Sequence, residues 1–173
     1  MRFTSVARGA EQLALPYRTV LDLLLESGMA RPSNSFVDGK PVFDEAEFME
    51  LASRPFIDTA DCPAAVVVKL GAPRQDVEGR PIGYSTTYDG KTLAEAYRKY
   101  WRVAKPHTHI GKALVATYAG FVVGVAEITD AIPLPHSDRV EFVIEPAKTS
   151  VRQAFENHRL KTRQGSVVEY IGK

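Results

Sequence analysis

Apolar positions in the first 55 residues recur at helical spacing, and a start or stop residue borders each stretch. Residues 6–14 carry apolar side chains three and four positions apart, and Thr4 or Ser5 can cap the helix that this spacing predicts. A second apolar stretch lies between Pro16, which suits the first turn of a helix, and the stop signal Gly28. The pattern predicts two helices joined by a short turn.

A hairpin and a third helix are predicted next. Asp38-Gly39 lies between β-forming residues, and this dipeptide favours a tight turn because both turn positions need a positive φ. Asp44 and Glu47 then form a capping box, with Phe43 and Phe48 at the two positions of a hydrophobic staple. The order predicted for residues 1–55 is helix, turn, helix, hairpin, helix.

Residues 64–173 contain mainly short apolar runs of the length typical of strands. Gly120 separates two of these runs and joins them into a predicted hairpin. A long polar loop is expected over 71–90. Five strands and two short helices within about 110 residues favour a compact, partly closed barrel. The predicted strands cover 64–70, 113–119, 121–128, 139–144 and 166–171, and one of the helices begins at Ser150.

The stretch from Thr92 to Arg102 has the pattern of an amphipathic helix. Thr92 and Glu95 form a capping box, and apolar side chains follow at helical spacing as far as Tyr100 and Trp101. The cations of this stretch lie largely off the apolar stripe. The sequence therefore predicts a helix with aromatic and cationic side chains, followed by the 113–128 hairpin.

Composition excludes several classes of protein. No run of 18 apolar residues is present, which argues against a membrane partner. The first residues lack the apolar core of a secretory signal, and the single cysteine, Cys62, fits a reducing compartment, so a cytoplasmic location is expected. Cys62 itself is expected to be a small packing residue. Prolines and polar residues over 56–63 predict a linker.

Charge is distributed unevenly along the chain. The net charge is +1, but residues 1–60 carry 6 Lys/Arg and 9 Asp/Glu, whereas residues 61–173 carry 16 and 12. Two segments are locally basic: 91–112 has six Lys/Arg with one acid, and 148–164 has five with one acid. Such segments indicate a polyanionic partner, with solvated surface as the alternative interpretation.

Residues 10–55 resemble the small excisionase or MerR-type winged helix-turn-helix modules, on the segments 13–20, 24–28 and 42–44. The resemblance implies that 16–25 is a recognition helix, with Tyr17, Arg18 and Thr19 facing the major groove and Lys40 in the wing. The module is acidic, however, and DNA affinity depends largely on phosphate neutralisation. Docking of a protein partner is therefore the alternative role for this module.

Residues 64–173 resemble the PUA-like domains of the ASCH and EVE types. The resemblance lies in 96–103, 112–128, 139–142 and the closing 165–171. It implies strands and short helices around a barrel, with a cleft that takes a nucleobase or a piece of RNA. The expected fold class is therefore α+β: a small winged-helix-like module at 1–55, a linker at 56–63, and a PUA-like mixed β-barrel with short helices at 64–173.

The expected function is binding of nucleic acid, DNA or RNA, with recognition of a modified or unpaired base. Stacking of bases on aromatic rings and contact of cations with phosphates are the chemistry of such a site. Packing in the core is the alternative role for the rings. The candidate residues are Tyr84, Tyr97, Arg98, Trp101, Arg102, Lys112 and Tyr118.

No motif for catalysis or for a cofactor is found in the sequence. There is no phosphate-binding GxxxxGK[ST] loop, no GxSxG elbow and no HExxH pair. His107 and His109 have no third ligand nearby and are expected in a solvent loop rather than in a metal site. The protein is therefore expected not to be an enzyme and to have no cofactor or metal. An adaptor for protein interactions and an enzyme acting on a nucleotide-like molecule are the alternatives, and the oligomeric state is open.

Overall fold

The structure is a computed structural model that describes residues 2–30, 32–161, 163 and 165–173, without the side chains of 32–35. It combines helices and strands in two compact units. The N-terminal unit comprises Met1–Arg54 with Ser85–Tyr88, and the C-terminal unit comprises Pro55–Tyr84 with Asp89–Lys173. Residues 56–63, predicted as a linker, thus belong to the C-terminal unit. Within the described residues, no helix has the length and hydrophobicity that crossing a bilayer requires.

The helices of the N-terminal unit begin where the sequence predicts. The Ser5 hydroxyl caps α1 (Val6–Leu13) by accepting a hydrogen bond from the Arg8 N–H at 3.3 Å. Pro16 immediately precedes α2 (Tyr17–Leu25), and Gly28 follows that helix with a φ of 72°. Asp44 caps α3 (Glu45–Ser53) by accepting from the Ala46 N–H at 2.9 Å. These starts and stops are local, which is why the pattern of the sequence predicts them.

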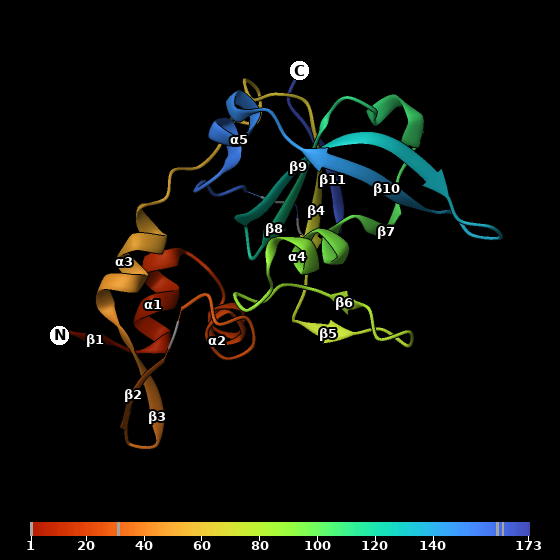
Figure 1. Cartoon of the computed structure of the whole chain (residues 1–173). Coiled ribbons are helices and arrows are strands. Elements are labelled where there is room, and N and C mark those ends of the chain that lie inside the picture. The colour runs from red at the N-terminus through yellow and green to blue at the C-terminus, as the bar shows by residue number, and fades with distance from the viewer. Residues whose placement is uncertain (1, 31, 162, 164) are drawn as a thin grey trace. The chain divides into compact units, whose positions relative to one another are not determined.

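The predicted hairpin of the N-terminal unit is confirmed. Strands β2 (Pro32–Val37) and β3 (Lys40–Asp44) meet at Asp38 and Gly39, which have φ values of 50° and 71°. A short β1 (Phe3–Thr4) pairs with the other edge of β3. The predicted staple also forms, because the rings of Phe43 and Phe48 pack edge to face with centroids 5.7 Å apart. Figure 1 shows this hairpin projecting from the helices of the unit.

A six-stranded sheet organises the C-terminal unit, in the order β11-β4-β8-β9-β10-β7. The neighbours β4 and β8 run parallel, and every other neighbouring pair is antiparallel. The sheet curls into a half-barrel (Figure 1). Its strands are β4 (Ala65–Leu70), β7 (Lys99–Arg102), β8 (Ala113–Tyr118), β9 (Phe121–Pro133), β10 (Arg139–Pro146) and β11 (Val168–Ile171).

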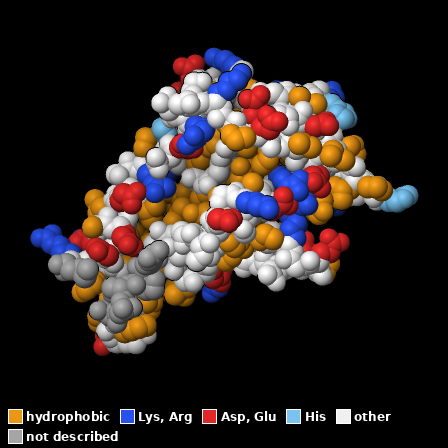
Figure 2. Space-filling view, viewed as in Figure 1, with side chains coloured by type: hydrophobic (Ala, Val, Ile, Leu, Met, Phe, Trp, Pro, Cys, Tyr) orange, Lys and Arg blue, Asp and Glu red, His pale blue; other side chains and the backbone are white. Residues whose placement is uncertain are grey.

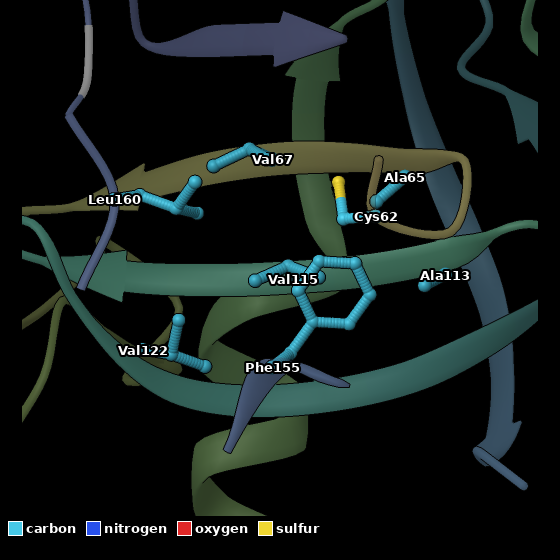
Figure 3. Close-up of a cluster of buried hydrophobic side chains, with 8 residues drawn as sticks. All are labelled: Cys62, Ala65, Val67, Ala113, Val115, Val122, Phe155 and Leu160. Atoms are coloured by element: carbon cyan, nitrogen blue, oxygen red, sulfur yellow. The ribbon is translucent and has the colours of Figure 1, made fainter. Parts of the chain in front are cut away.

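The two parallel strands, β4 and β8, are buried on both faces, as parallel strands usually are. On one face, Phe155 of α5 (Thr149–Phe155) packs against alternate residues of β4 and β8, including Val67 and Val115 (Figure 3). Cys62 is part of this cluster, so the predicted packing role is confirmed. On the opposite face, Tyr97 of α4 (Gly90–Tyr97) lies against Gly124 of β9. Each helix therefore covers its own face of the sheet.

The region between β4 and β8 differs from its prediction in two ways. The polar loop over 71–90 contains a small hairpin, β5 (Arg74–Gln75) and β6 (Pro81–Ile82). Residues Ser85–Tyr88 of the same loop belong to the N-terminal unit, where the Thr86 N–H donates to the Ser27 carbonyl at 2.8 Å. Sequence patterns do not show such a contact, because nearly sixty residues separate its partners.

The prediction of one helix over 92–102 is wrong. The helix begins earlier, capped by Asp89, whose carboxylate accepts from the Thr92 N–H at 2.7 Å, and it ends at Tyr97. Residues Lys99–Arg102 instead form β7, the edge strand that pairs with β10. The Phe142 N–H donates to the Arg98 carbonyl at 2.8 Å, at the point where the helix gives way to the strand. Pairing with β10 thus overrides the helical spacing of the apolar residues.

Candidate nucleic-acid interface

The curled sheet is tied together by a contact between the segment after β7 and the opposite edge strand, β11. The Ala104 N–H donates a hydrogen bond to the Tyr170 hydroxyl at 3.0 Å. The His109 ring stacks on the Tyr170 ring with centroids 4.8 Å apart and planes 5° apart. His109 Nε2 lies 3.1 Å from the Ala104 carbonyl oxygen. We call these three residues, Ala104, His109 and Tyr170, the seam.

The protonation of His109 follows from this geometry. Because a carbonyl only accepts, the Nε2 atom carries the hydrogen and Nδ1 is left as an acceptor. Nδ1 is buried and has no hydrogen-bond partner among the described residues. Burial of the ring lowers the pKa of His109. His109 lies in a 3-10 turn (Pro106–His109) and is buried, which corrects the prediction of a solvent loop.

Trp101 and Arg102 lie on β7, three and two residues before Ala104. The Trp101 indole N–H donates to the Tyr97 carbonyl at 2.7 Å, which fixes the orientation of a half-buried ring. The Arg102 side chain is 69% exposed and pairs with the equally exposed Asp138 at 2.9 Å. An exposed ion pair of this kind is weak, so the guanidinium can exchange Asp138 for another anion.

Arg98 lies in a network of paired charges. Its guanidinium donates two hydrogen bonds to the Glu95 carboxylate, at 2.8 and 2.9 Å, and a third to Glu141. The bonds from Arg98 lower the pKa of Glu95, and the same pairing raises the pKa of Arg98. Lys99 lies 3.5 Å from Glu95. The charges of Arg98 and Lys99 are thus already neutralised by acids. Figure 2 shows acidic and basic side chains close together on the face in view.

The same network supports β7. Arg80 pairs with Asp76 at 2.9 Å and donates to the backbone carbonyls of Glu95 and Lys99, at 3.1 and 3.3 Å. Its guanidinium also lies 4.9 Å from the centroid of the Tyr100 ring. These charges therefore position the strand that carries Trp101 and Arg102.

Tyr97 is part of the core. The side chain is only 6% exposed, and burial raises the pKa of its hydroxyl to about 12. A Cβ atom at Gly124 would lie 2.7 Å from the Tyr97 ring, so the ring and the strand are in close contact. A ring held in this way is not available for stacking on a base.

Tyr118 and Lys112 lie at the two ends of β8, and the Lys112 N–H donates to the His109 carbonyl at 3.0 Å. The rings of Tyr84 and Tyr118 pack against each other with centroids 5.4 Å apart, and Tyr118 is buried. Lys112 precedes the first residue of β8, whereas Tyr118 is its last. Since a strand rises about 3.3 Å per residue, the two lie at opposite ends of β8. The structure therefore does not gather the candidate residues into one cluster.

The candidate DNA-contacting residues of the N-terminal unit are at its surface. Tyr17 and Arg18 begin α2 and are exposed, Thr19 is half-buried, and Lys40 begins β3 in an exposed position. Arg18 pairs with Asp22 at 2.9 Å. The cation that would face a phosphate is thus balanced by an acid on the same helix.

A groove of about 490 Å³ runs along β11 and was not predicted as a site. It is lined by β11 itself, by Thr59, and by Lys161, Arg163 and Ser166. The sequence marks Lys161 and Arg163 only as members of a basic segment. The groove depends on the pairing of β11 with β4, which no local pattern reveals.

The seam brings the two basic segments of the sequence to a common region. The basic segment 91–112 reaches the seam through Arg102, Ala104 and Lys105. The basic segment 148–164 reaches the groove along β11, which Tyr170 also lines. Among the described residues, no three side chains of the metal-ligating types converge. Comparison of the chain with family models, with curated protein sequences and with solved structures finds no match.

Proposed function

We propose that the C-terminal unit is a non-catalytic binding module for nucleic acid, and that it binds single-stranded segments or unpaired bases beside the seam. One observation supports this above the others. The bond between Ala104 and Tyr170 joins the basic segment 91–112 to β11, which lies far from it in the sequence, close to half-exposed rings. Aromatic rings flanked by cations are the usual surface for single strands, because rings stack on bases and cations meet phosphates.

The proposal keeps some of the predicted residues and adds another. Trp101 and Arg102 remain the leading candidates, since the indole is half-buried with a fixed orientation and the guanidinium is exposed. Arg139 adds a second exposed cation, because it lies opposite Arg102 in the register of β7 and β10. Arg98 is instead proposed to position β7 through its carboxylate partners.

Trp101→Ala tests this function. We expect affinity for a single-stranded oligonucleotide of about ten nucleotides to fall about ten-fold, since stacking on one ring contributes about 1–3 kcal/mol. Fluorescence anisotropy of a labelled oligonucleotide measures the affinity, and circular dichroism checks the fold. Arg152→Gln, on α5 within the second basic segment, is the control, because its charge pairs with Glu156.

Salt dependence provides the second readout of the same experiment. Affinity should decrease clearly between about 50 and 200 mM salt, because binding to phosphates releases condensed counterions. A flat salt response, or equal affinity of Trp101→Ala and the parent protein, would contradict binding at this surface. Duplexes of the same sequence and oligonucleotides with modified bases then show which form is preferred.

A second candidate function, docking of a protein partner, concerns the N-terminal unit. Several large apolar side chains on its strands and helices are more than half exposed, which is typical of interaction surfaces. The unit is also acidic over most of its sequence, which disfavours DNA. The exposed side chains are Tyr17, Leu25, Phe36, Val37 and Met49. If Leu25→Ser abolishes binding of a purified protein partner, and the parent protein does not bind DNA through this unit, the docking role is supported.

A further inference from the structure

Phe56 combines an exposed ring with a fixed backbone. The Arg159 N–H donates to the Pro55 carbonyl at 2.8 Å, and the Ile57 N–H donates to the Arg159 carbonyl at 2.8 Å. The backbone on both sides of Phe56 is therefore bonded to the segment that contains Arg159. Phe56 itself is nonetheless 46% exposed. A ring held in this way loses little conformational freedom when a ligand packs on it.

Arg159 covers one face of the Phe56 ring. Its guanidinium lies 4.6 Å from the centroid of the Phe56 ring and 4.9 Å from the centroid of the Phe121 ring. Arg159 also pairs through its backbone with both residues, so it stands between the two rings, and it is only 5% exposed. The exposed part of Phe56 therefore belongs mainly to the face turned away from Arg159 and to the ring edge. A planar group can stack there without displacing the guanidinium.

Lys161 connects this ring with the groove along β11. Its Nζ atom lies 5.2 Å from the centroid of the Phe56 ring, and the same residue lines the groove together with Thr59 and Arg163. The preceding residue, Leu160, is buried in the core cluster of Figure 3, which anchors the segment from which Lys161 extends. The ring and the groove thus share one cation.

The groove carries an excess of positive charge. Lys161 and Arg163 are exposed, and neither has an acidic partner among the residues that the structure describes. The one carboxylate in the described lining, Glu169, is engaged: it pairs with Lys69 at 2.6 Å and accepts the Arg163 N–H at 2.5 Å. Lys69 in turn donates to the Arg163 carbonyl. The backbone of Arg163 is therefore held, while its guanidinium can meet an anion in the groove.

The outer edge of β11 does not suit an added peptide strand. The Val168 carbonyl already accepts from the Ser166 hydroxyl. The Gly172 N–H donates to the Thr59 carbonyl at 3.1 Å. An extended peptide could not pair along the whole strand, so these contacts disfavour binding by strand addition. A ligand that offers a flat ring and an anion suits the surface better.

We infer that Phe56 and the β11 groove form a subsite for one nucleotide, in which the base stacks on the exposed face of Phe56 and the phosphate contacts Lys161 and Arg163. The groove volume of about 490 Å³ falls within the range of small-molecule sites. This inference rests on the proposed function, because it gives one nucleotide of the bound strand its place near β11, the strand that the seam engages. It also predicts that a single nucleotide binds without the rest of a strand.

Mononucleotides test the subsite directly. We expect adenosine 5′-monophosphate to bind at least about ten-fold more tightly than adenosine, because only the nucleotide offers a phosphate to the two cations. Nuclear magnetic resonance titration of the intact protein measures both affinities and also follows the ring protons of Phe56. Upfield shifts of these protons are expected if a base stacks on the ring. Equal binding of the two probes, or no shift at Phe56, would overturn the inference.

Phe56→Leu and Phe56→Tyr test the ring. We expect Leu to lower nucleotide affinity about ten-fold and Tyr to retain it, since Tyr keeps an aromatic face. Phe36→Leu is the matched control, because it removes an exposed phenylalanine ring from the N-terminal unit and should change nothing. Equal affinity of Phe56→Leu and the parent protein would contradict stacking at this position. Circular dichroism checks the fold of each variant.

Substitution of both cations tests the phosphate contacts and does not depend on the folding of Phe56→Leu. Lys161→Gln with Arg163→Gln should remove adenosine monophosphate binding and lower the salt slope for a single-stranded oligonucleotide by about 0.7 per lost contact. Lys148→Gln with Arg152→Gln removes the same charge from the same basic segment outside the groove and should change neither. An unchanged slope and affinity in the first double variant would rule out the subsite.

Two further probes separate the nucleotide from simpler ligands. Inorganic phosphate should bind more weakly than adenosine monophosphate, because it lacks a ring to stack on Phe56. Equal affinity for the two would show that the ring contributes nothing and would overturn the inference. Effective competition by an oligoglutamate peptide at equal concentration would point to a peptide ligand and overturn it as well.

Failure of this inference can be told apart from failure of the proposed function. If oligonucleotides bind and the variants of Phe56 and of the groove bind them equally well, the subsite is wrong and the function of the unit stands. If adenosine monophosphate binds at Phe56 and no oligonucleotide binds, the subsite stands and strand binding is wrong.

Discussion

At the scale of single residues, burial decides what each candidate side chain can do. Tyr97 has an aromatic ring like Tyr170, but it is sealed against Gly124, whereas nearly half of Tyr170 is exposed. Arg98 has the same charge as Arg163, but two carboxylates hold it. Residue type alone therefore could not rank these candidates, because their surroundings come from distant parts of the chain.

The pH dependence of stability is predicted from His109. Its pKa is lowered in the folded protein, mainly by burial, so the unfolded chain binds more protons as the pH falls below the ordinary histidine value of about 6.5. The stabilising effect of neutral His109 is complete above that pH and is lost as the pH falls toward the lowered value. We therefore expect the C-terminal unit to lose stability as the pH falls below about 6.5.

Trp101 provides the measurement for this prediction. It is the single tryptophan of the chain and lies in the C-terminal unit, so its fluorescence during urea unfolding follows that unit. His109→Gln should flatten the pH dependence, whereas substitution of the exposed His107 by Gln should leave it unchanged. Equal slopes for the parent and His109→Gln would show that other groups cause the effect.

At the scale of elements, the sequence predicted what is determined locally. The caps at Ser5 and Asp44, the Asp38-Gly39 hairpin and the 113–128 hairpin are all present, since each depends on residues within a few positions. The error over 92–102 has the opposite cause. Apolar residues at helical spacing also suit an edge strand, and only the distant β10 determines which forms.

The β8–β9 turn gives a prediction at this scale. Ala119 and Gly120 have φ values of 49° and 84°, and a Cβ at Gly120 would lie 2.9 Å from the Leu160 carbonyl oxygen. Gly120→Ala should therefore destabilise the unit by more than the about 1–2 kcal/mol that a left-handed backbone costs a residue with a side chain. Urea unfolding followed by Trp101 fluorescence measures the change.

Gly111→Ala is the matched control for this turn. Gly111 also has a positive φ, of 83°, but nothing lies within 4 Å of the position of its Cβ. Its substitution should show the backbone cost alone. Equal destabilisation by the two substitutions would mean that the contact with Leu160 adds nothing.

At the scale of the whole molecule, each unit has its own core. Leu24 is buried in the N-terminal unit, and Val115 is buried in the C-terminal unit. Leu24→Ala should lower the free energy of unfolding of its unit by about 2–5 kcal/mol. It should barely move the urea midpoint that Trp101 fluorescence reports, because Trp101 lies in the other unit. Val115→Ala should shift the fluorescence midpoint strongly. Far-ultraviolet circular dichroism follows both units, and shifts that coincide for every probe and variant would contradict independent unfolding.

The arrangement of the whole sheet was the part of the fold that the sequence could not provide. Five strands were predicted and the sheet has six, and a partly closed barrel was expected from them. No local pattern, however, shows which strands pair with β4. β4 pairs with β8 and β11, which lie about 50 and 100 residues further along the chain. The groove and the seam depend on those pairings, so they could not be found from motifs.

This pairing has a consequence during protein synthesis. A ribosome that adds about 5–20 residues per second needs about 5–20 s to proceed from β4 to β11. Throughout that interval the nascent chain presents Val66, Val67 and Val68 with one edge of their strand uncovered. A β-branched strand with a free edge readily pairs with strands of other chains and aggregates. Efficient production of this protein should therefore depend on chaperones that shield β4 until β11 has been synthesised.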